Sequence, residues 1–190
     1  MKIGIAEFCP RQPDLVVSGI NAGLNAGINV LYSGTVAAAI EGAFYGCTSV
    51  AVSLQYEQHF QFDSAAALAR QIIEQVLGQT RPEPQLYNVN IPTAALTGEP
   101  RVCVAPMSVA RYESRFEKRN DPFGRPYYWL SGGRAPDVAG HETDVSAIGK
   151  GMISVTPLDY NMTRQAALTE MDQWQFRLRA EPTSHGRKLS

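Results

Sequence analysis

The chain has 190 residues, of which 44% are hydrophobic and 18% charged, so it can bury a core as one domain. Its formal net charge of -1 provides no overall field to attract a nucleic acid or an anionic membrane. Three cysteines at wide spacing, without a CxxC motif, argue against a disulfide framework or a zinc site. Without a signal peptide or an apolar run of membrane-spanning length, the sequence predicts a cytoplasmic protein.

The first predicted elements form a strand–helix–strand pattern. The segments DLVVSG (14–19) and TSVAVSL (48–54) are short, apolar on both faces and closed by turn residues, which is typical of buried strands. Between them, SGTVAAAIEGAFYG predicts a helix that Ser33 caps and Gly46 ends. This order of elements predicts a parallel sheet.

A second helix and further strands follow. The segment DSAAALARQIIEQVLG has apolar residues at every fourth position, with Asp63 or Ser64 as the expected cap and Gly78 beyond the end. LYNVNIP (86–92) predicts another strand, and after residue 100 strands are predicted in RVCVAPMSV, YYWLSGG and GMISVTPL. NDPFGRP is expected to form the turn before the aromatic strand.

These elements predict an α/β fold, a Rossmann-like three-layer arrangement with a mostly parallel sheet. We expect a single domain with residues 1–100 as its α/β core portion, residues 101–160 as a β-rich arm and strands, and residues 161–190 as a C-terminal helix and tail. Basic residues outnumber acidic ones between 111 and 134, which suits either phosphate binding or a subunit interface. The adjacent aromatics YYW favour the interface.

The glycine- and asparagine-rich segment SGINAGLNAGINVLYSGT predicts a ligand site. In a doubly wound sheet, ligands bind beyond the carboxyl ends of the strands, and a helix that begins near Ser33 offers backbone N–H groups to an anion. The amides of Asn21 and Asn25 present oxygens of the type that magnesium and manganese accept. Spacing alone also allows plain turns and a helix cap, because the glycines form neither a GxGxxG nor a Walker motif.

Other candidate groups are weaker. His59, His141 and His185 show no HxxxH spacing and are predicted to be surface residues. Ser18 and Ser53 lack a GxSxG elbow, which disfavours a serine hydrolase. The missing GxGxxG likewise excludes a dinucleotide-binding oxidoreductase.

The continuous segment PDLVVSGINAGLNAGINVLYSGTVAAAIEGAFYG resembles the signature of the survival protein E (SurE) family, and LYNVNIP, DPFGRPYYWLSGG and ETDVSAIGKGMISVTPL agree with it. The resemblance implies a metal-dependent 5'/3'-nucleotidase, also called an acid phosphatase. It implies that Asn21 binds the divalent metal, Mg²⁺ or Mn²⁺, and that Ser33, Gly34 and Thr35 line the phosphate pocket, with Asn25 a weaker candidate for its wall. It also implies a homo-oligomer, a dimer or tetramer, with subunit contacts made by the later β segments.

One departure from the family pattern affects the expected chemistry. Family members open with a strand that ends in NDDG, whose aspartates bind the metal and are implicated in catalysis, and a metal-binding serine follows. This chain carries neither, so its catalytic residues are unknown, and we expect a fragment, a misplaced start or a shortened paralogue of low stability. If the chain nevertheless binds Mn²⁺, the ligands would be sought among Asp137, Asp144 and Asp159.

Two functions are therefore predicted. The first is a phosphomonoesterase that hydrolyses nucleoside monophosphates and whose metal site is incomplete in this chain. The alternative is a non-catalytic remnant that binds phosphate ligands or acts as an oligomerisation partner.

Overall fold

The structure is a computed structural model that describes residues 1–79, 83–111, 115–131 and 142–179. It divides into two compact units, Met1–Asp159 and Tyr160–Ser190. The second unit contains the helix α5 (Gln165–Asp172), which has no buried residue. Among the described residues, none of the helices combines the length and the hydropathy needed to span a bilayer.

The first unit is built on a five-stranded sheet with the order β1-β2-β3-β7-β4. Its strands are β1 (Leu15–Ala22), β2 (Thr48–Leu54), β3 (Leu86–Ile91), β4 (Val102–Val104) and β7 (Ile153–Pro157). β1, β2 and β3 are parallel, β7 is antiparallel to β3, and β4 is parallel to β7. The predicted mostly parallel α/β sheet is confirmed.

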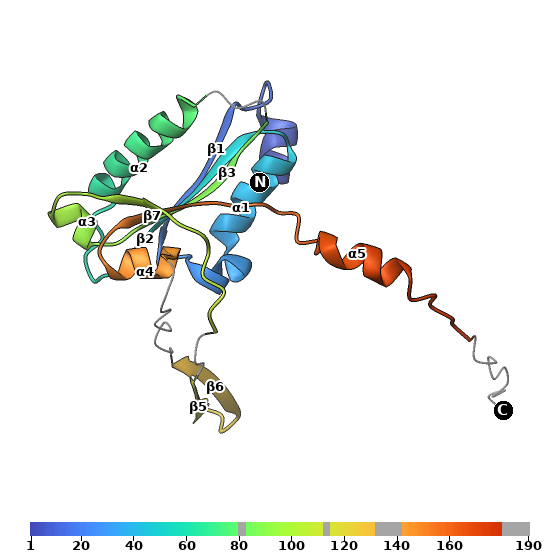
Figure 1. Cartoon of the computed structure of the whole chain (residues 1–190). Coiled ribbons are helices and arrows are strands. Elements are labelled where there is room, and N and C mark those ends of the chain that lie inside the picture. Colours follow the sequence, from blue (N-terminus) through green and yellow to red (C-terminus); the bar gives the residue numbers. More distant parts are fainter. Residues whose placement is uncertain (80–82, 112–114, 132–141, 180–190) are drawn as a thin grey trace. The chain divides into compact units, whose positions relative to one another are not determined.

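Helices cover both faces of this sheet (Figure 1). α1 (Gly34–Phe44) packs against one face and α2 (Phe62–Leu77) against the other. The predicted cap at Ser33 is confirmed, since its side chain accepts the Val36 N–H. The predicted cap of α2 at Asp63 or Ser64 is wrong. This helix begins at Phe62 and Asp63 lies in its first turn, where a negative charge interacts favourably with the helix dipole.

The short elements are η1 (Gly4–Phe8, a π-helix), η2 (Gly27–Tyr32, a 3-10 helix), α3 (Ala94–Thr97) and α4 (Asp144–Gly149). η2 leads directly into α1, and α4 precedes β7. α4 was not predicted, because six residues are too few to show a helical period.

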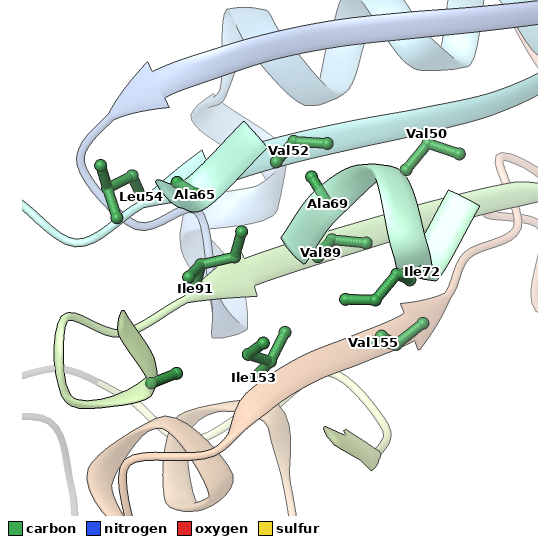
Figure 2. Packing of buried hydrophobic residues seen from close by; sticks show 11 residues of the cluster. Val50, Val52, Leu54, Ala65, Ala69, Ile72, Val89, Ile91, Ile153 and Val155 are labelled. Atoms are coloured by element: carbon green, nitrogen blue, oxygen red, sulfur yellow. The ribbon is translucent and has the colours of Figure 1, made fainter. Parts of the chain in front are cut away.

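The face of the sheet under α2 is apolar (Figure 2). The α2 residues Ala65, Ala69 and Ile72 pack on valine, leucine and isoleucine side chains of β2, β3 and β7. Six of the strand residues are at most 1% exposed: Val50, Val52, Leu54, Val89, Ile91 and Ile153. This continuous apolar layer accounts for much of the stability of the fold, because burying each such side chain contributes about 1.5–3 kcal/mol.

The opposite face of the same strands is partly polar. Because successive strand residues point to opposite faces, the positions between the apolar ones face α1. Ala51 and Leu86 pack with α1. The remaining alternate positions carry buried polar side chains: Ser49, Ser53, Asn88, Asn90, Ser154 and Thr156. Buried polar groups need hydrogen-bond partners. The segments that cover this face must therefore supply donors and acceptors as well as apolar contacts.

The strands predicted after residue 100 divide between two sheets. β4 and β7 complete the main sheet, whereas β5 (Arg115–Asn120) and β6 (Pro126–Ser131) form a separate antiparallel pair. The NDPFGRP turn is confirmed, since Asp121 Oδ1 accepts the N–H groups of Phe123 and Arg125, each at 2.9 Å. β5 was not predicted, because every one of its residues is exposed and its sequence has no apolar alternation.

Candidate functional site

The parallel strands β1, β2 and β3 end at one edge of the sheet, where polar residues stand in register. Asn21 of β1 is aligned with Ser53 of β2, and Ser53 is aligned with Asn90 of β3. The carboxyl ends of parallel strands are where α/β sheets bind ligands. The structure therefore brings Asn21 into a row of amide and hydroxyl groups.

The end of β1 has a specific backbone shape. The strand was predicted to stop at residue 19, but its pairing with β2 resumes at Asn21 after a shift in register and continues to Ala22. Gly19 has a φ of +122°, and a Cβ at this position would collide with the carbonyl oxygen of Val52. A glycine is required here, and it allows β1 to approach β2 closely before the pairing resumes at Asn21.

Asn21 is half-buried, and its side chain folds back on its own loop. The Nδ2 group donates to the carbonyl oxygen of Gly23 at 2.6 Å. This hydrogen bond fixes the orientation of the amide and leaves its carbonyl oxygen as the atom suited to contact a cation. The structure is thus compatible with one neutral oxygen ligand at this position.

Asn25 anchors the glycine-rich loop to the polar face of the sheet. Its backbone N–H donates to Asn90 Oδ1 at 2.8 Å, and its Nδ2 donates to Ser53 Oγ at 2.7 Å. Its carbonyl oxygen accepts from Asn88 Nδ2 at 2.7 Å and from Asn90 Nδ2 at 3.2 Å. The buried amides of β3 therefore hold this loop in place. The sequence did not indicate this anchoring role of Asn25.

Asp144 holds the next part of the same loop. It is fully buried, and its Oδ2 accepts the Gly27 N–H at 2.7 Å. Its Oδ1 accepts the N–H groups of Ser108 and Val145, each at 2.8 Å. Both carboxylate oxygens are therefore engaged by backbone donors. Asp144 acts as a clamp that joins the glycine-rich loop to the segment before β5 and to α4.

Sequence reasoning did not identify this clamp. Asp144 was considered only as a reserve metal ligand in the later strands, whereas it is the first residue of α4. A local indication exists in the sequence TDVS, because Thr143 and Ser146 form a reciprocal capping box. That motif could have predicted α4 but not the loop that the carboxylate reaches, 117 residues away.

The first turn of α1 is the part of this site that faces solvent. Ser33 Oγ accepts the Val36 N–H at 3.1 Å, so this hydroxyl serves as the helix cap. Helix geometry leaves the N–H groups of Gly34 and Thr35 without an intrahelical acceptor. Gly34 is exposed, and no atom lies within 4 Å of where its Cβ would be. An anion can therefore approach the backbone here, where the helix end also provides positive potential.

The described residues do not supply the carboxylates that a divalent cation prefers. No group of three or more His, Cys, Asp or Glu side chains that could hold a metal occurs among them. Asp14 instead pairs with Arg11 at 2.7 Å on the surface, and the hydrogen bond and charge of Arg11 lower the pKa of Asp14. Since hard cations rely on anionic oxygens, the neutral groups around Asn21 do not by themselves make a Mg²⁺ or Mn²⁺ site.

The other sequence candidates lie outside this site or have structural contacts. His59 is exposed, which confirms it as a surface residue, and Ser53 is buried and bonded to Asn25. His141, His185 and Asp137 lie outside the described residues.

Known proteins share both the sequence and the architecture of this chain. A family model described as survival protein SurE matches residues 1–114. The chain belongs to the SurE family. It is 49% identical over 178 residues to the 5'-nucleotidase SurE of Rhodopirellula baltica, an alignment that covers 93% of this chain and 70% of that protein. It is 37% identical to the 5'-nucleotidase SurE of Heliobacterium modesticaldum, over 92% of this chain and 64% of that protein.

The fold of a SurE protein of known structure agrees with this relationship. The crystal structure of the SurE protein from Aquifex aeolicus superposes with a TM-score of 0.77 at 33% identity. The match covers 90% of this chain and 69% of that protein. The chain thus spans roughly two thirds of the length of these SurE proteins and shares their family of 5'-nucleotidases.

Proposed function

We propose that the chain provides the phosphate-binding part of a phosphomonoesterase that hydrolyses nucleoside 5'- or 3'-monophosphates to nucleoside and phosphate. The observation that carries this proposal is the loop between β1 and α1. Asn25 is anchored to β2 and β3 and Gly27 to Asp144, while the first turn of α1 stays open at Gly34. The names of the curated relatives, 5'-nucleotidases, support the reaction class.

The residues of this site would act on the phosphoryl group by binding and orienting it. The N–H groups of Gly34 and Thr35 would donate to its oxygens, and the Thr35 hydroxyl would add a further donor. Ser33 would position these groups by fixing the first turn, since its Oγ already accepts the Val36 N–H. A preorganised set of donors is what an oxyanion requires for tight recognition.

We further propose that hydrolysis depends on Mg²⁺ or Mn²⁺ and that Asn21 contributes one amide oxygen to that ion. The carboxylates that such an ion needs would have to come from groups other than the described residues. In this chain, Asn21 is therefore a metal-binding residue, Ser33, Gly34, Thr35 and Asn25 belong to the phosphate site, and no catalytic residue is assigned.

The test of the phosphate site uses the 190-residue chain and inorganic phosphate. Titration followed by backbone amide NMR should shift the Gly34 and Thr35 signals and give a modest affinity. Thr35→Ala should weaken binding, whereas Thr97→Ala, at the end of α3, is the matched control and should leave it unchanged. If phosphate shifts neither Gly34 nor Thr35, this loop is only a turn and a helix cap.

Two further measurements address the metal and the reaction. Calorimetry should show only weak Mn²⁺ binding to the chain, because a single neutral oxygen attracts a hard cation poorly. Submillimolar binding would contradict this expectation. If p-nitrophenyl phosphate is hydrolysed in the presence of Mn²⁺, Asn21→Ala should lower the turnover, and Thr35→Ala should chiefly raise KM. A chain that binds phosphate without any turnover would match the predicted non-catalytic remnant.

We also propose a homo-oligomer in the cytoplasm. The β5–β6 pair exposes Tyr127, Tyr128 and Trp129, which are 40%, 65% and 54% accessible, and such aromatic side chains are enriched at interfaces. Light scattering of the chain with and without Trp129→Ala tests this contact. The three cysteines are all free, which fits a reducing compartment.

A further inference from the structure

The second unit, Tyr160–Ser190, contains a segment in which polar and apolar side chains alternate. Residues 173–179 read QWQFRLR and follow directly after α5. Every second residue is apolar, namely Trp174, Phe176 and Leu178, and the residues between them are glutamines and arginines. Because successive side chains of an extended chain point to opposite faces, this pattern is typical of a strand with one apolar face.

The apolar side chains of this segment are accessible. Trp174, Phe176 and Leu178 are 53%, 71% and 95% exposed. A hollow of about 600 Å³ lies beside Phe176 and is also lined by Leu168 and Met171 of α5. Large apolar side chains that are exposed together mark an interaction surface. The segment and the neighbouring side of α5 therefore present one apolar surface that a partner can cover.

In the single chain, the backbone departs from the extended conformation at one residue. Gln175 has a φ of +46°, a region that residues with a Cβ rarely adopt. The rings on either side of it, Trp174 and Phe176, contact each other edge-on with their centroids 5.8 Å apart. Pairing with a partner strand would extend Gln175 and replace this ring contact with contacts to the partner.

The order of the side chains makes the segment complementary to a second copy of itself. When two segments pair antiparallel with Phe176 opposite Phe176, Trp174 lies opposite Leu178 and each arginine lies opposite a glutamine. A pairing centred on Arg177 or Leu178, or a parallel pairing in register, would place arginines opposite each other. Aromatic pairs stabilise facing strands, whereas like charges directly opposite destabilise them. The sequence therefore favours the pairing centred on Phe176.

We propose that residues 173–179 of two copies of this chain pair as an antiparallel two-stranded ribbon. A ribbon of two strands is marginally stable alone, so its apolar face must be covered. Leu168 and Met171 line the hollow beside Phe176 and supply that cover. The interface is isologous, since the same segment serves both copies. It involves residues other than those of the β5–β6 pair and is independent of the proposed phosphate site.

Disulfide cross-linking of the 190-residue chain tests the register. Phe176→Cys should give a covalent dimer under mild oxidation, because this position faces its own copy with the Cα atoms about 4.5–5.5 Å apart. Leu178→Cys is the matched control. Its copy lies four residues along the partner strand, roughly 14 Å away, and is out of reach of a disulfide. The parent chain, whose three cysteines are free, gives the background.

Sedimentation equilibrium measures the strength of the contact. Phe176→Asp should weaken the dimer by about tenfold or more, because two carboxylates replace the facing rings at the centre. Gln175→Asp should strengthen it by about twofold or more, because each new carboxylate faces an arginine of the second copy. High salt should reduce this gain.

Three outcomes overturn the proposal: a chain that stays monomeric at all concentrations, equal cross-linking of Phe176→Cys and Leu178→Cys, and a dimer that Phe176→Asp leaves unchanged. A dimer that Trp129→Ala dissociates, and in which Phe176→Cys forms no cross-link, also overturns it, because the β5–β6 pair then makes the contact. A Phe176→Cys cross-link that survives Trp129→Ala, together with tighter association of Gln175→Asp, supports the ribbon.

Discussion

The two faces of the central sheet differ in composition although they belong to the same strands. Under α2, Val52 and Ile91 are completely buried in an apolar layer. On the other face, the equally buried Asn88 and Asn90 direct their amides to the backbone of Asn25. One face thus stabilises the fold through apolar burial, and the other uses hydrogen bonds to hold the loop that carries the proposed anion site. Substitutions on the two faces should therefore affect different properties.

The largest effect is expected on the apolar face. Ile91→Ala should lower the free energy of unfolding by about 2–5 kcal/mol, because it removes a fully buried side chain and leaves a cavity. Urea denaturation measures this change. Val104→Ala is the control, since Val104 is 73% exposed and its loss should change stability by about 0.5 kcal/mol or less. Under conditions in which Ile91→Ala remains folded, its affinity for phosphate should equal that of the parent.

A smaller loss of stability with a larger loss of binding is expected for Asp144→Asn. The amide keeps one oxygen and places an NH₂ group against a backbone donor, so at least one N–H loses its acceptor. The free energy of unfolding should fall by about 1–3 kcal/mol. Phosphate should bind several-fold more weakly because Gly27 is released. If phosphate affinity is unchanged while stability falls, the clamp is purely structural and the contrast between the faces is weaker than described.

Ser154→Ala should have little effect on stability. Ser154 Oγ is buried and has no hydrogen-bond partner within the described part of the chain. Removing an unsatisfied buried hydroxyl eliminates its desolvation cost, so the free energy of unfolding should stay the same or rise by up to about 1 kcal/mol. Thermal denaturation tests this, with Thr156→Val as the comparison, because Thr156 Oγ1 donates to the Ala105 carbonyl at 2.9 Å. A clear loss in Ser154→Ala would reveal a water-mediated contact.

The smallest effect is expected outside both faces, at the exposed pair Arg11 and Asp14. Their hydrogen bond and charge lower the pKa of Asp14, so its contribution to stability is present above the ordinary aspartate pKa and is lost as the pH falls through the lowered one. Arg11→Gln should return the pKa of Asp14 toward its ordinary value, as measured by NMR titration. Stability at neutral pH should hardly change, because both groups are exposed. An unchanged pKa would contradict the pairing.

The elements that could be predicted from the sequence are those that residues close together in the chain define. The bounds of β2 and the cap of α1 were predicted because six of the seven residues in Thr48–Leu54 are buried and Ser33 contacts a backbone group three residues away. α4 and β5 were missed, because the former has only six residues and the latter is defined only by its pairing with β6.

The candidate site divides in the same way. Asn21, Ser33, Gly34 and Thr35 could be named from the sequence because they form one segment that resembles a family signature. The contacts that fix this segment could not be named, since Asn25 bonds to Asn88 and Asn90 across more than 60 residues. The residues proposed to bind ligands were thus accessible to sequence reasoning, and the residues that position them were not.

The long sequence separation between Gly27 and Asp144 affects the order in which the protein folds during its synthesis. β1, α1, β2 and β3 all emerge from the ribosome before residue 100, whereas the carboxylate that fixes Gly27 follows its partner by 117 residues. Contacts this distant in sequence form late, because the intervening chain must first be ordered. A nascent chain that ends before α4 carries the glycine-rich loop without its clamp. We therefore expect the proposed anion site to be completed only once α4 has been synthesised, after the parallel strands that precede residue 100.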